Sequence, residues 1–193
     1  LGDVYKRQGA IIASDECYLY LGWATEPVSV LHPSVTGGDN TGLLALHSLS
    51  KTSNLASYRC GMISGDEALV QELLEVRKHA GLIVPGPIQH AMVAALESDL
   101  HEEMQRSAYA SRRLELLKAL PDAGFTVDHS DAGLYLWVRR EGMDSRQALD
   151  WFADRGILGA PGDFYGPAGA SHVRIALTAP DEKITKAARR ITQ

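Results

Sequence analysis

The chain has 193 residues, of which 45% are hydrophobic and 22% are charged, and it carries a net charge of −5. This is enough chain to bury a core as one sizeable domain or two small ones, and the charge argues against nucleic acid as a partner. No apolar run approaches the roughly 18 residues of a membrane span, and two cysteines are too few for a disulfide scaffold or a four-cysteine zinc site. We therefore expect a reducing, cytoplasmic setting without a membrane partner.

The beginning of the chain differs from the rest of it. Residues 1–8 fit no later pattern, and we interpret them as a leader, a linker or an assembly artefact. Residues 9–15 are typical of a buried strand that runs into polar residues. Because a domain rarely begins on a central strand, we expect that the chain lacks its natural N-terminal part.

The middle of the chain predicts strands first and helices afterwards. Consecutive apolar positions in the strands favour a sheet that is covered on both faces. Residues 64–67 have the spacing of a helix capping box, and a break at residues 84–87 separates the helix after that box from the next one. The expected strands are residues 43–47 and 60–64, and the later helices are residues 88–100 and 101–120, the second ending near Pro121 and Gly124.

The pattern changes after Gly124 to that of a compact α+β domain. The expected strands there are residues 125–128, 134–138, 157–158 and 172–177, and the expected helices are residues 144–155 and 181–191. The last helix is amphipathic, with apolar residues at i, i+3, i+4 and i+7. None of the seven histidines pairs at metal-ligand spacing, so no metal site is expected.

Residues 48–61 are the most informative stretch. Lys51 follows an apolar strand, behind the hydroxyl residues Ser48 and Ser50, and Arg59 stands eight positions later. A desolvated lysine loses proton affinity and becomes a nucleophile that can form a Schiff base, while hydroxyls and an arginine suit a phosphate group. On this stretch alone, a lysine that reaches water beside an N-cap serine is the simpler interpretation.

Asp15 stands at the end of another expected apolar strand, and Tyr18 follows three residues later. The carboxyl ends of parallel strands meet at one edge of a sheet, where ligands bind. Together with residues 48–61, these side chains suit pyridoxal 5'-phosphate: the lysine takes the aldehyde, the aspartate the ring nitrogen, the tyrosine the ring oxygen, and the arginine and serines the phosphate. We therefore predict this cofactor.

Three segments resemble the class I/II, fold-type I, pyridoxal-phosphate-dependent aminotransferases: Asp15–Tyr18, Ser48–Gly61 and Val173–Leu177. The resemblance covers about residues 9–193 and corresponds to the C-terminal half of such an enzyme. It implies an α/β fold in which residues 9–105 form the C-terminal part of the large cofactor-binding domain and residues 106–193 a small α+β domain. The chain departs from the family motif at Ser57 and Cys60, neither of which has a chemical role there.

The resemblance also implies roles for individual residues. Lys51 matches the lysine that forms the Schiff base and moves the proton, Asp15 matches the partner of the ring nitrogen, and Tyr18 matches the donor to the ring oxygen. Three residues match phosphate ligands: Ser48, Ser50 and Arg59.

In the C-terminal part, Arg174 matches the arginine that binds the substrate α-carboxylate through two parallel hydrogen bonds. Without the resemblance, a strand arginine in a surface ion pair would be the simpler interpretation. Residues 133–137 resemble the family's strand near the substrate, and residues 160–166 resemble the loop before that arginine.

Within the family, residues 15–23, 26–33 and 164–169 resemble actinobacterial succinyldiaminopimelate transaminases. That resemblance implies amino transfer between glutamate and the keto precursor of N-succinyl-diaminopimelate, on the way to lysine. Family members are homodimers with the site at the subunit boundary, and their N-terminal half supplies part of the cofactor shell. We therefore expect this chain to be inactive on its own.

Two other functions stay open. A lyase or decarboxylase on the same scaffold would keep all the residues named above. The effector domain of a transcription regulator would instead be non-enzymatic, and it would carry a basic winged-helix segment upstream.

Overall fold

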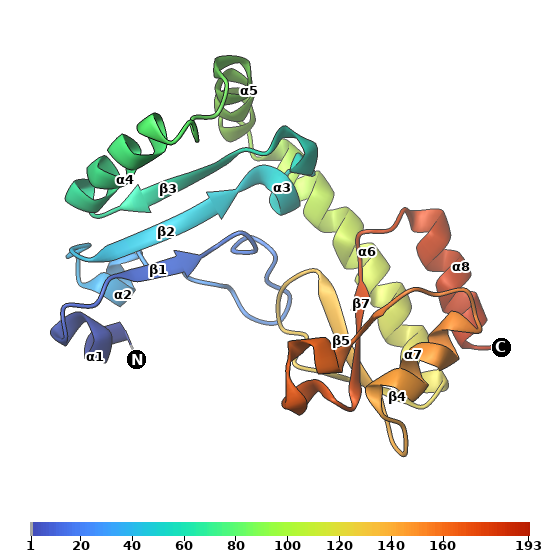
Figure 1. Ribbon diagram of the computed structural model, residues 1–193. Helices are drawn as coiled ribbons and strands as arrows, with labels where there is room; N and C mark the ends of the chain where they lie inside the picture. Colours follow the sequence, from blue (N-terminus) through green and yellow to red (C-terminus); the bar gives the residue numbers. More distant parts are fainter. Residues whose placement is uncertain (1) are drawn as a thin grey trace. The chain divides into compact units, whose positions relative to one another are not determined.

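The computed structural model describes residues 2–193 and divides them into two compact units (Figure 1). The first unit comprises the chain up to residue 20 together with residues 26–105. The second comprises residues 21–25 and 106–193. The short segment 21–25 thus packs with the C-terminal part of the chain, where Trp23 Nε1 donates to the carbonyl oxygen of Gly133 at 2.7 Å.

The first unit is built on a three-stranded sheet with the order β1-β2-β3. Its strands are β1 (Ile12–Asp15), β2 (Leu43–Ser48) and β3 (Gly61–Gly65). The first two strands are parallel, with Asp15 opposite Leu46, whereas β3 runs antiparallel to β2. The parallel pair therefore brings the carboxyl ends of β1 and β2 to the same edge.

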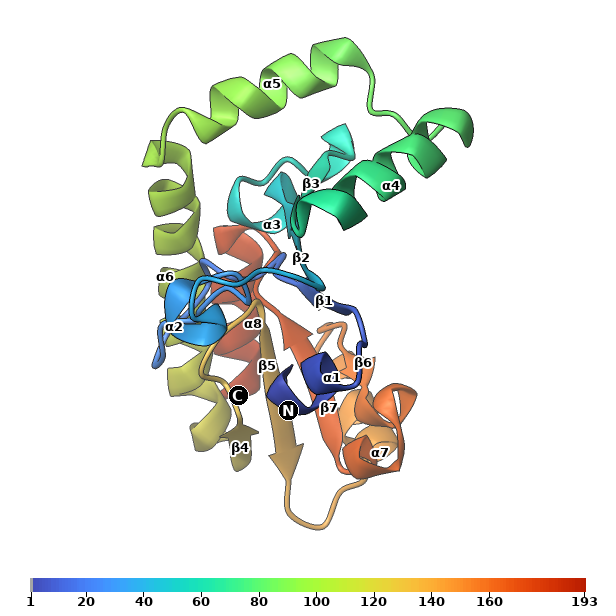
Figure 2. The same ribbon diagram turned by 90° about the vertical axis from the view of Figure 1, so that its left-hand side faces the viewer.

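Helices surround this sheet unevenly. In both views α4 lies alongside β3, whereas α5 extends away from the sheet (Figures 1 and 2). The helix α6 (Leu100–Asp122) begins in the first unit and continues into the second. The remaining helices of the first unit are α1 (Gly2–Arg7), α2 (Pro33–Thr36), α3 (Leu49–Thr52), the 3-10 helix η1 (Ala56–Tyr58), α4 (Glu67–His79) and α5 (Gly86–Leu96).

Two expectations for this unit are met in part or not at all. Burial on both faces holds for the first half of β2, where Leu43, Leu44 and Ala45 are all buried, but not for β1, whose alternate residues are exposed, or for β3, where Met62 is 37% exposed. The capping box does not form, because Ser64 is paired with Ala45 in the sheet. Asp66 caps α4 instead, since its carboxylate accepts hydrogen bonds from the backbone N–H groups of Ala68 and Leu69, at 2.9 and 3.2 Å.

The second unit contains an antiparallel four-stranded sheet with the order β4-β5-β7-β6. Residues alternate between its two faces, as a period of two requires. One face is buried in the core, and the other carries half-buried polar and aromatic residues. The strands are β4 (Phe125–Asp128), β5 (Tyr135–Arg140), β6 (Ala160–Pro161) and β7 (His172–Ala176).

Three helices cover the core face: α6, α7 (Ser145–Ala153) and α8 (Asp181–Ile191). In both views α6 and α8 run side by side (Figures 1 and 2), and Arg112 of α6 bonds to Asp181 of α8 at 2.5 Å. Two short 3-10 helices, η2 (Gly162–Tyr165) and η3 (Pro167–Gly169), precede β7. The largest fully buried side chains of this unit include Phe152, Leu116, Leu120, Leu134, Leu136 and Val173.

The strand expected at residues 157–158 is wrong. Ile157 is buried but Leu158 is 91% exposed, and pairing with β7 begins only at Ala160. Two apolar neighbours predicted a strand here, yet only one of them reaches the core. By contrast, Asp144 caps α7 as expected, in a capping box with Gln147.

None of the helices in residues 2–193 combines the length and the apolar character that crossing a membrane requires. Across the same residues, no group of three or more His, Cys, Asp and Glu side chains is arranged to hold a metal ion.

Candidate active site

The candidate site begins where the two parallel strands of the first unit end. Asp15 is the last residue of β1, and β2 ends at Ser48, from which the chain passes directly into α3 with Lys51. Because β1 and β2 are parallel and in register, these ends lie at one edge of the sheet. Asp15 thus stands at one of two adjacent strand ends, and the helical turn that carries Lys51 starts from the other.

Lys51 does not stand at a strand end itself, because a single helical turn, α3, is interposed. Ser48 caps this turn, and its Oγ accepts the backbone N–H of Ser50 at 3.1 Å. Lys51 is half-buried and stands in the last turn of the helix. The N-cap serine of the simpler interpretation is therefore present, and it also starts the turn that carries the lysine.

Hydroxyl groups gather at the start of this turn. Ser48 Oγ lies 2.8 Å from Ser50 Oγ and 3.2 Å from the carbonyl oxygen of Cys60. Since a hydroxyl has a single proton, Ser48 can donate to only one of these oxygens at a time. The arrangement ties the end of β2 to the start of β3 and holds two hydroxyls next to each other.

The loop after Lys51 contains backbone strain. Asn54 and Arg59 adopt left-handed conformations, with φ of 54° and 53°. Such conformations are uncommon for residues other than glycine, and they concentrate at functional sites. The Arg59 side chain is exposed and donates one hydrogen bond from Nη1 to the carbonyl oxygen of Ala56, at 3.1 Å. An exposed guanidinium has further donors to offer, which suits an anionic ligand.

Asp15, Cys17 and Lys51 interact electrostatically. The thiol of Cys17 and its backbone N–H, which is 3.1 Å from Asp15 Oδ1, hydrogen-bond to the carboxylate and lower the pKa of Asp15. Burial, followed by the Asp15 carboxylate, raises the pKa of Cys17 to about 11, and the Lys51 ammonium opposes this shift. Asp15 therefore stays ionised while the neighbouring thiol stays protonated.

An open hollow of about 420 Å³ adjoins these residues within the first unit. Polar residues, Asp15, Cys17 and Arg59, line one part of it, and apolar residues of β2, β3 and α4 line another. The structure thus brings the predicted acid and the predicted phosphate ligand Arg59 to one concave surface. Tyr18 is half-buried in the turn that follows β1.

One buried acid beside this site carries no signal in the sequence. Glu16 is 6% exposed, its Oε1 accepts the backbone N–H of Val30 at 2.6 Å, and its Oε2 lies 3.3 Å from His47 Nε2. The second contact has the distance of an ion pair without the direction of a hydrogen bond. An acid directly after a strand end normally faces water, so only the long-range contact with residue 30 distinguishes Glu16.

Arg174 lies in β7 of the second unit. Its guanidinium carbon is 4.1 Å from the centre of the Tyr135 ring and 5.3 Å from that of Tyr165. Among the residues that the structure describes, its buried Nε has no hydrogen-bond partner. The structure therefore does not place Arg174 in the surface ion pair of the simpler interpretation, and an arginine edge with an unused donor suits a carboxylate.

Comparison with known proteins identifies the class. The profile of the family "Aminotransferase class I and II" matches residues 1–191, and the chain belongs to this family. The match includes residues 1–8, whose origin stays a prediction. A solved aminotransferase structure from Neisseria meningitidis Z2491 is 31% identical, with a TM-score of 0.87 over 98% of this chain and 50% of that one. The predicted family and α/β fold are thus confirmed.

Three curated relatives of this chain are transaminases or are named as probable aminotransferases. The Mycobacterium tuberculosis protein named probable aminotransferase Rv1178 is 63% identical over 97% of this chain and 44% of its own length. The 4-dedimethylamino-4-oxo-anhydrotetracycline transaminase OxyQ of Streptomyces rimosus is 57% identical over 97% of this chain and 52% of its own length. The LL-diaminopimelate aminotransferase of Aquifex aeolicus is 35% identical over 99% of this chain and 50% of its own length. The chain spans about half the length of the curated relatives it matches.

Enzymes of this family depend on pyridoxal 5'-phosphate, which agrees with the predicted cofactor. The geometry of the first unit also fits pyridoxal phosphate, independently of the family match. A half-buried amine lies within electrostatic range of the Asp15–Cys17 pair, paired hydroxyls precede it, and a strained loop presents an exposed arginine. The donor set therefore matches an aldehyde, a protonated ring nitrogen and a phosphate.

Proposed function

We propose that the full-length protein, expressed from its complete reading frame, transfers an amino group between an amino acid and a 2-oxo acid with pyridoxal phosphate. The observation that carries this proposal is the pair of adjacent parallel strand ends, with Asp15 at the end of β1 and Lys51 in the helical turn that follows β2. Family membership supports it.

Each residue has a distinct task in this proposal. Lys51 holds the cofactor through its amine and, once released, moves a proton as general base and acid. Asp15 stays ionised and pairs with the ring nitrogen, and Tyr18 donates to the ring oxygen. Ser48, Ser50 and Arg59 hold the phosphate. When bound, pyridoxal phosphate supplies an electron sink that makes the substrate Cα–H bond acidic.

Arg174 binds the α-carboxylate that every amino-acid and 2-oxo-acid substrate carries. A guanidinium offers two parallel donors that match the two oxygens of a carboxylate, which a lysine cannot reproduce. Its buried, unused Nε supports this assignment.

For the substrate itself, we propose N-succinyl-diaminopimelate with 2-oxoglutarate, as a step of lysine biosynthesis. The resemblance of residues 15–23, 26–33 and 164–169 supports it, and a relative that acts on LL-diaminopimelate is consistent with this chemistry. The high identity to OxyQ favours a second candidate, the amination of a ring ketone.

The same proposal extends to assembly and domains. We expect a cytoplasmic homodimer, with residues 9–105 as the C-terminal part of the large domain and residues 106–193 as the small domain. On its own, the 193-residue chain is expected to bind pyridoxal phosphate poorly and to be inactive.

The test compares amino donors in the full-length protein. N-succinyl-diaminopimelate with 2-oxoglutarate should give a higher kcat/KM than free diaminopimelate, aspartate or alanine. Equal or better turnover of aspartate or alanine would remove the succinyl specificity and leave transamination intact. Preference for an oxo-anhydrotetracycline would favour the second candidate, and product formation without a 2-oxo acid would indicate a lyase.

A further inference from the structure

The outer face of the second unit's sheet carries a row of aromatic residues around Arg174. Arg174 on β7 is opposite Trp137 on β5, and Tyr135 lies two residues before Trp137, on the same face. The neighbours on the other face, Leu136 and Val173, are fully buried in the core. This face therefore does not belong to the hydrophobic core, although it is rich in aromatic rings.

Two rings contact the Arg174 guanidinium. Tyr135 is the nearer, at 4.1 Å from the guanidinium carbon, and Tyr165 of η2 is at 5.3 Å. Both distances lie within the range of cation–π attraction. Cation–π contacts use none of the hydrogen-bond donors of the guanidinium, which agrees with a buried Nε that has no hydrogen-bond partner in the described residues.

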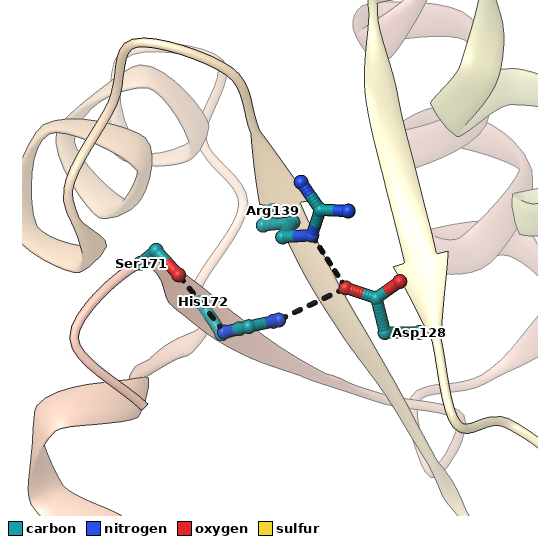
Figure 3. Close-up of polar contacts among 4 residues, drawn as sticks. All are labelled: Asp128, Arg139, Ser171 and His172. Atoms are coloured by element: carbon teal, nitrogen blue, oxygen red, sulfur yellow. Dashed lines mark hydrogen bonds and ion pairs between the residues drawn. The ribbon is translucent and has the colours of Figure 1, made fainter. Parts of the chain in front are cut away.

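Tyr165 is itself held in place. Trp137 meets it edge-on, with ring centres 5.7 Å apart, and stacks flat on His172 at 4.9 Å. Asp128 anchors that histidine (Figure 3), with 3.0 Å between His172 Nε2 and Asp128 Oδ2. The approach of η2 to this row requires a glycine at position 162, because a Cβ there would collide with the Gly169 carbonyl oxygen and lie 2.9 Å from Trp137.

We propose that Tyr135 and Tyr165 are positioning residues that fix the plane of the Arg174 guanidinium, so that its free edge meets the substrate α-carboxylate. This inference rests on the proposed function, in which Arg174 binds that carboxylate. A long, flexible arginine loses side-chain freedom when it binds a ligand, and prior orientation by two rings reduces that loss. The effect is the same for ground state and transition state, so it acts on KM and leaves kcat nearly unchanged.

The experiment uses single variants of the full-length protein loaded with pyridoxal phosphate (PLP). Tyr135→Leu and Tyr165→Leu should each raise KM for both the amino donor and 2-oxoglutarate by roughly 5- to 30-fold, with kcat within about twofold. Tyr135→Phe and Tyr165→Phe keep the ring and should restore KM to within about threefold of the parent. Calorimetry with succinate, which carries carboxylates but neither an amino nor an oxo group, should rank the parent, the Phe variants and the Leu variants by Kd in the same order as by KM.

The matched control is Trp151→Leu. Trp151 also stacks on an arginine, Arg155 at 3.7 Å, but it belongs to α7 and packs against Phe125. It should lower the melting temperature without changing KM. Since Tyr165 is 53% exposed, Tyr165→Leu carries the test if Tyr135→Leu does not fold.

The outcomes separate the two proposals. If the Leu variants keep the parental KM while Arg174→Lys raises it, the positioning role is wrong and the carboxylate site stands. An unchanged KM in Arg174→Lys and Arg174→Leu would overturn the carboxylate site itself. A fall in kcat without a change in KM, or Phe variants as poor as the Leu variants, would also overturn the positioning role.

Discussion

His172 and Asp128 form a polar pair across the second unit's sheet, with 3.0 Å between His172 Nε2 and Asp128 Oδ2 (Figure 3). The same carboxylate oxygen accepts a hydrogen bond from Arg139 Nε at 2.6 Å, and His172 Nδ1 lies 3.2 Å from Ser171 Oγ. Two donors therefore converge on one oxygen, which strengthens the case for an ionised carboxylate.

Stability of the second unit should accordingly fall in acid. The hydrogen bond from His172, followed by that from Arg139, lowers the pKa of Asp128 below its ordinary 3.8. A carboxyl whose pKa is lower in the folded state contributes stability above the ordinary value, and this contribution is lost as the pH falls through the lowered value. Urea unfolding followed by tryptophan fluorescence between pH 7 and pH 2.5 should show this loss, and Asp128→Asn should flatten the acid limb. An acid limb of unchanged slope in Asp128→Asn would contradict the prediction.

Lys51 should be the lysine that holds the cofactor. Borohydride reduction of the PLP-loaded full-length protein, followed by peptide mapping, should find the label on Lys51. Lys51→Ala should lose at least the roughly 10²- to 10⁴-fold that general acid–base catalysis contributes. Lys78→Ala is the matched control, because Lys78 is exposed and paired with Glu75 at 3.2 Å, and it should retain parental activity. Label on Lys78 or Lys118 would refute the assignment.

Much of this fold could be predicted because its elements carry strong local patterns. The amphipathic spacing of Ile184, Ala188 and Ile191 predicted α8 over 181–191, and the apolar run from Leu43 predicted β2. Local signals failed where tertiary contacts decided the outcome. Ser64 has the right spacing for a cap, but pairing with β2 removes it and Asp66 takes its place.

The candidate site shows the same division. Asp15 and Lys51 could be found because Asp15 ends one apolar run and Lys51 closely follows another, and the parallel pairing of β1 and β2 then brings the ends of both strands to one edge. Their detailed roles in this protein stay predictions. The resemblance placed the segments of Tyr135 and Tyr165 near Arg174, but the ring contacts could not be predicted. The contact of Tyr135 depends on the pairing of β5 with β7, and that of Tyr165 depends on the fold of η2.

Cys17 should react slowly with alkylating reagents. With its pKa raised to about 11, chiefly by burial and then by Asp15, its thiolate fraction at pH 8 is roughly two orders of magnitude below that of an ordinary cysteine. Iodoacetamide labelling, followed by mass spectrometry across pH 7–11, should show a rate that still rises at pH 10. Asp15→Asn should shift the profile to lower pH, because the carboxylate that opposes the thiolate is gone. A profile that levels off near pH 8.5 would contradict the raised pKa.

Glu16 should stabilise the first unit through its two contacts. Glu16→Ala removes the acceptor of the Val30 N–H, which is 2.6 Å from Oε1, and leaves that donor and His47 without their partner. An unsatisfied buried polar group costs about 1–3 kcal/mol, so Glu16→Ala should lower the free energy of unfolding by that amount. Glu16→Gln keeps an oxygen for Val30 and should lose less, because only the charge facing His47 is removed. Urea titrations of the 193-residue chain at pH 7 measure both variants. If Gln and Ala are equally destabilising, the charge beside His47 matters more than the hydrogen bond to Val30, and if neither changes stability, the buried carboxylate has no structural role.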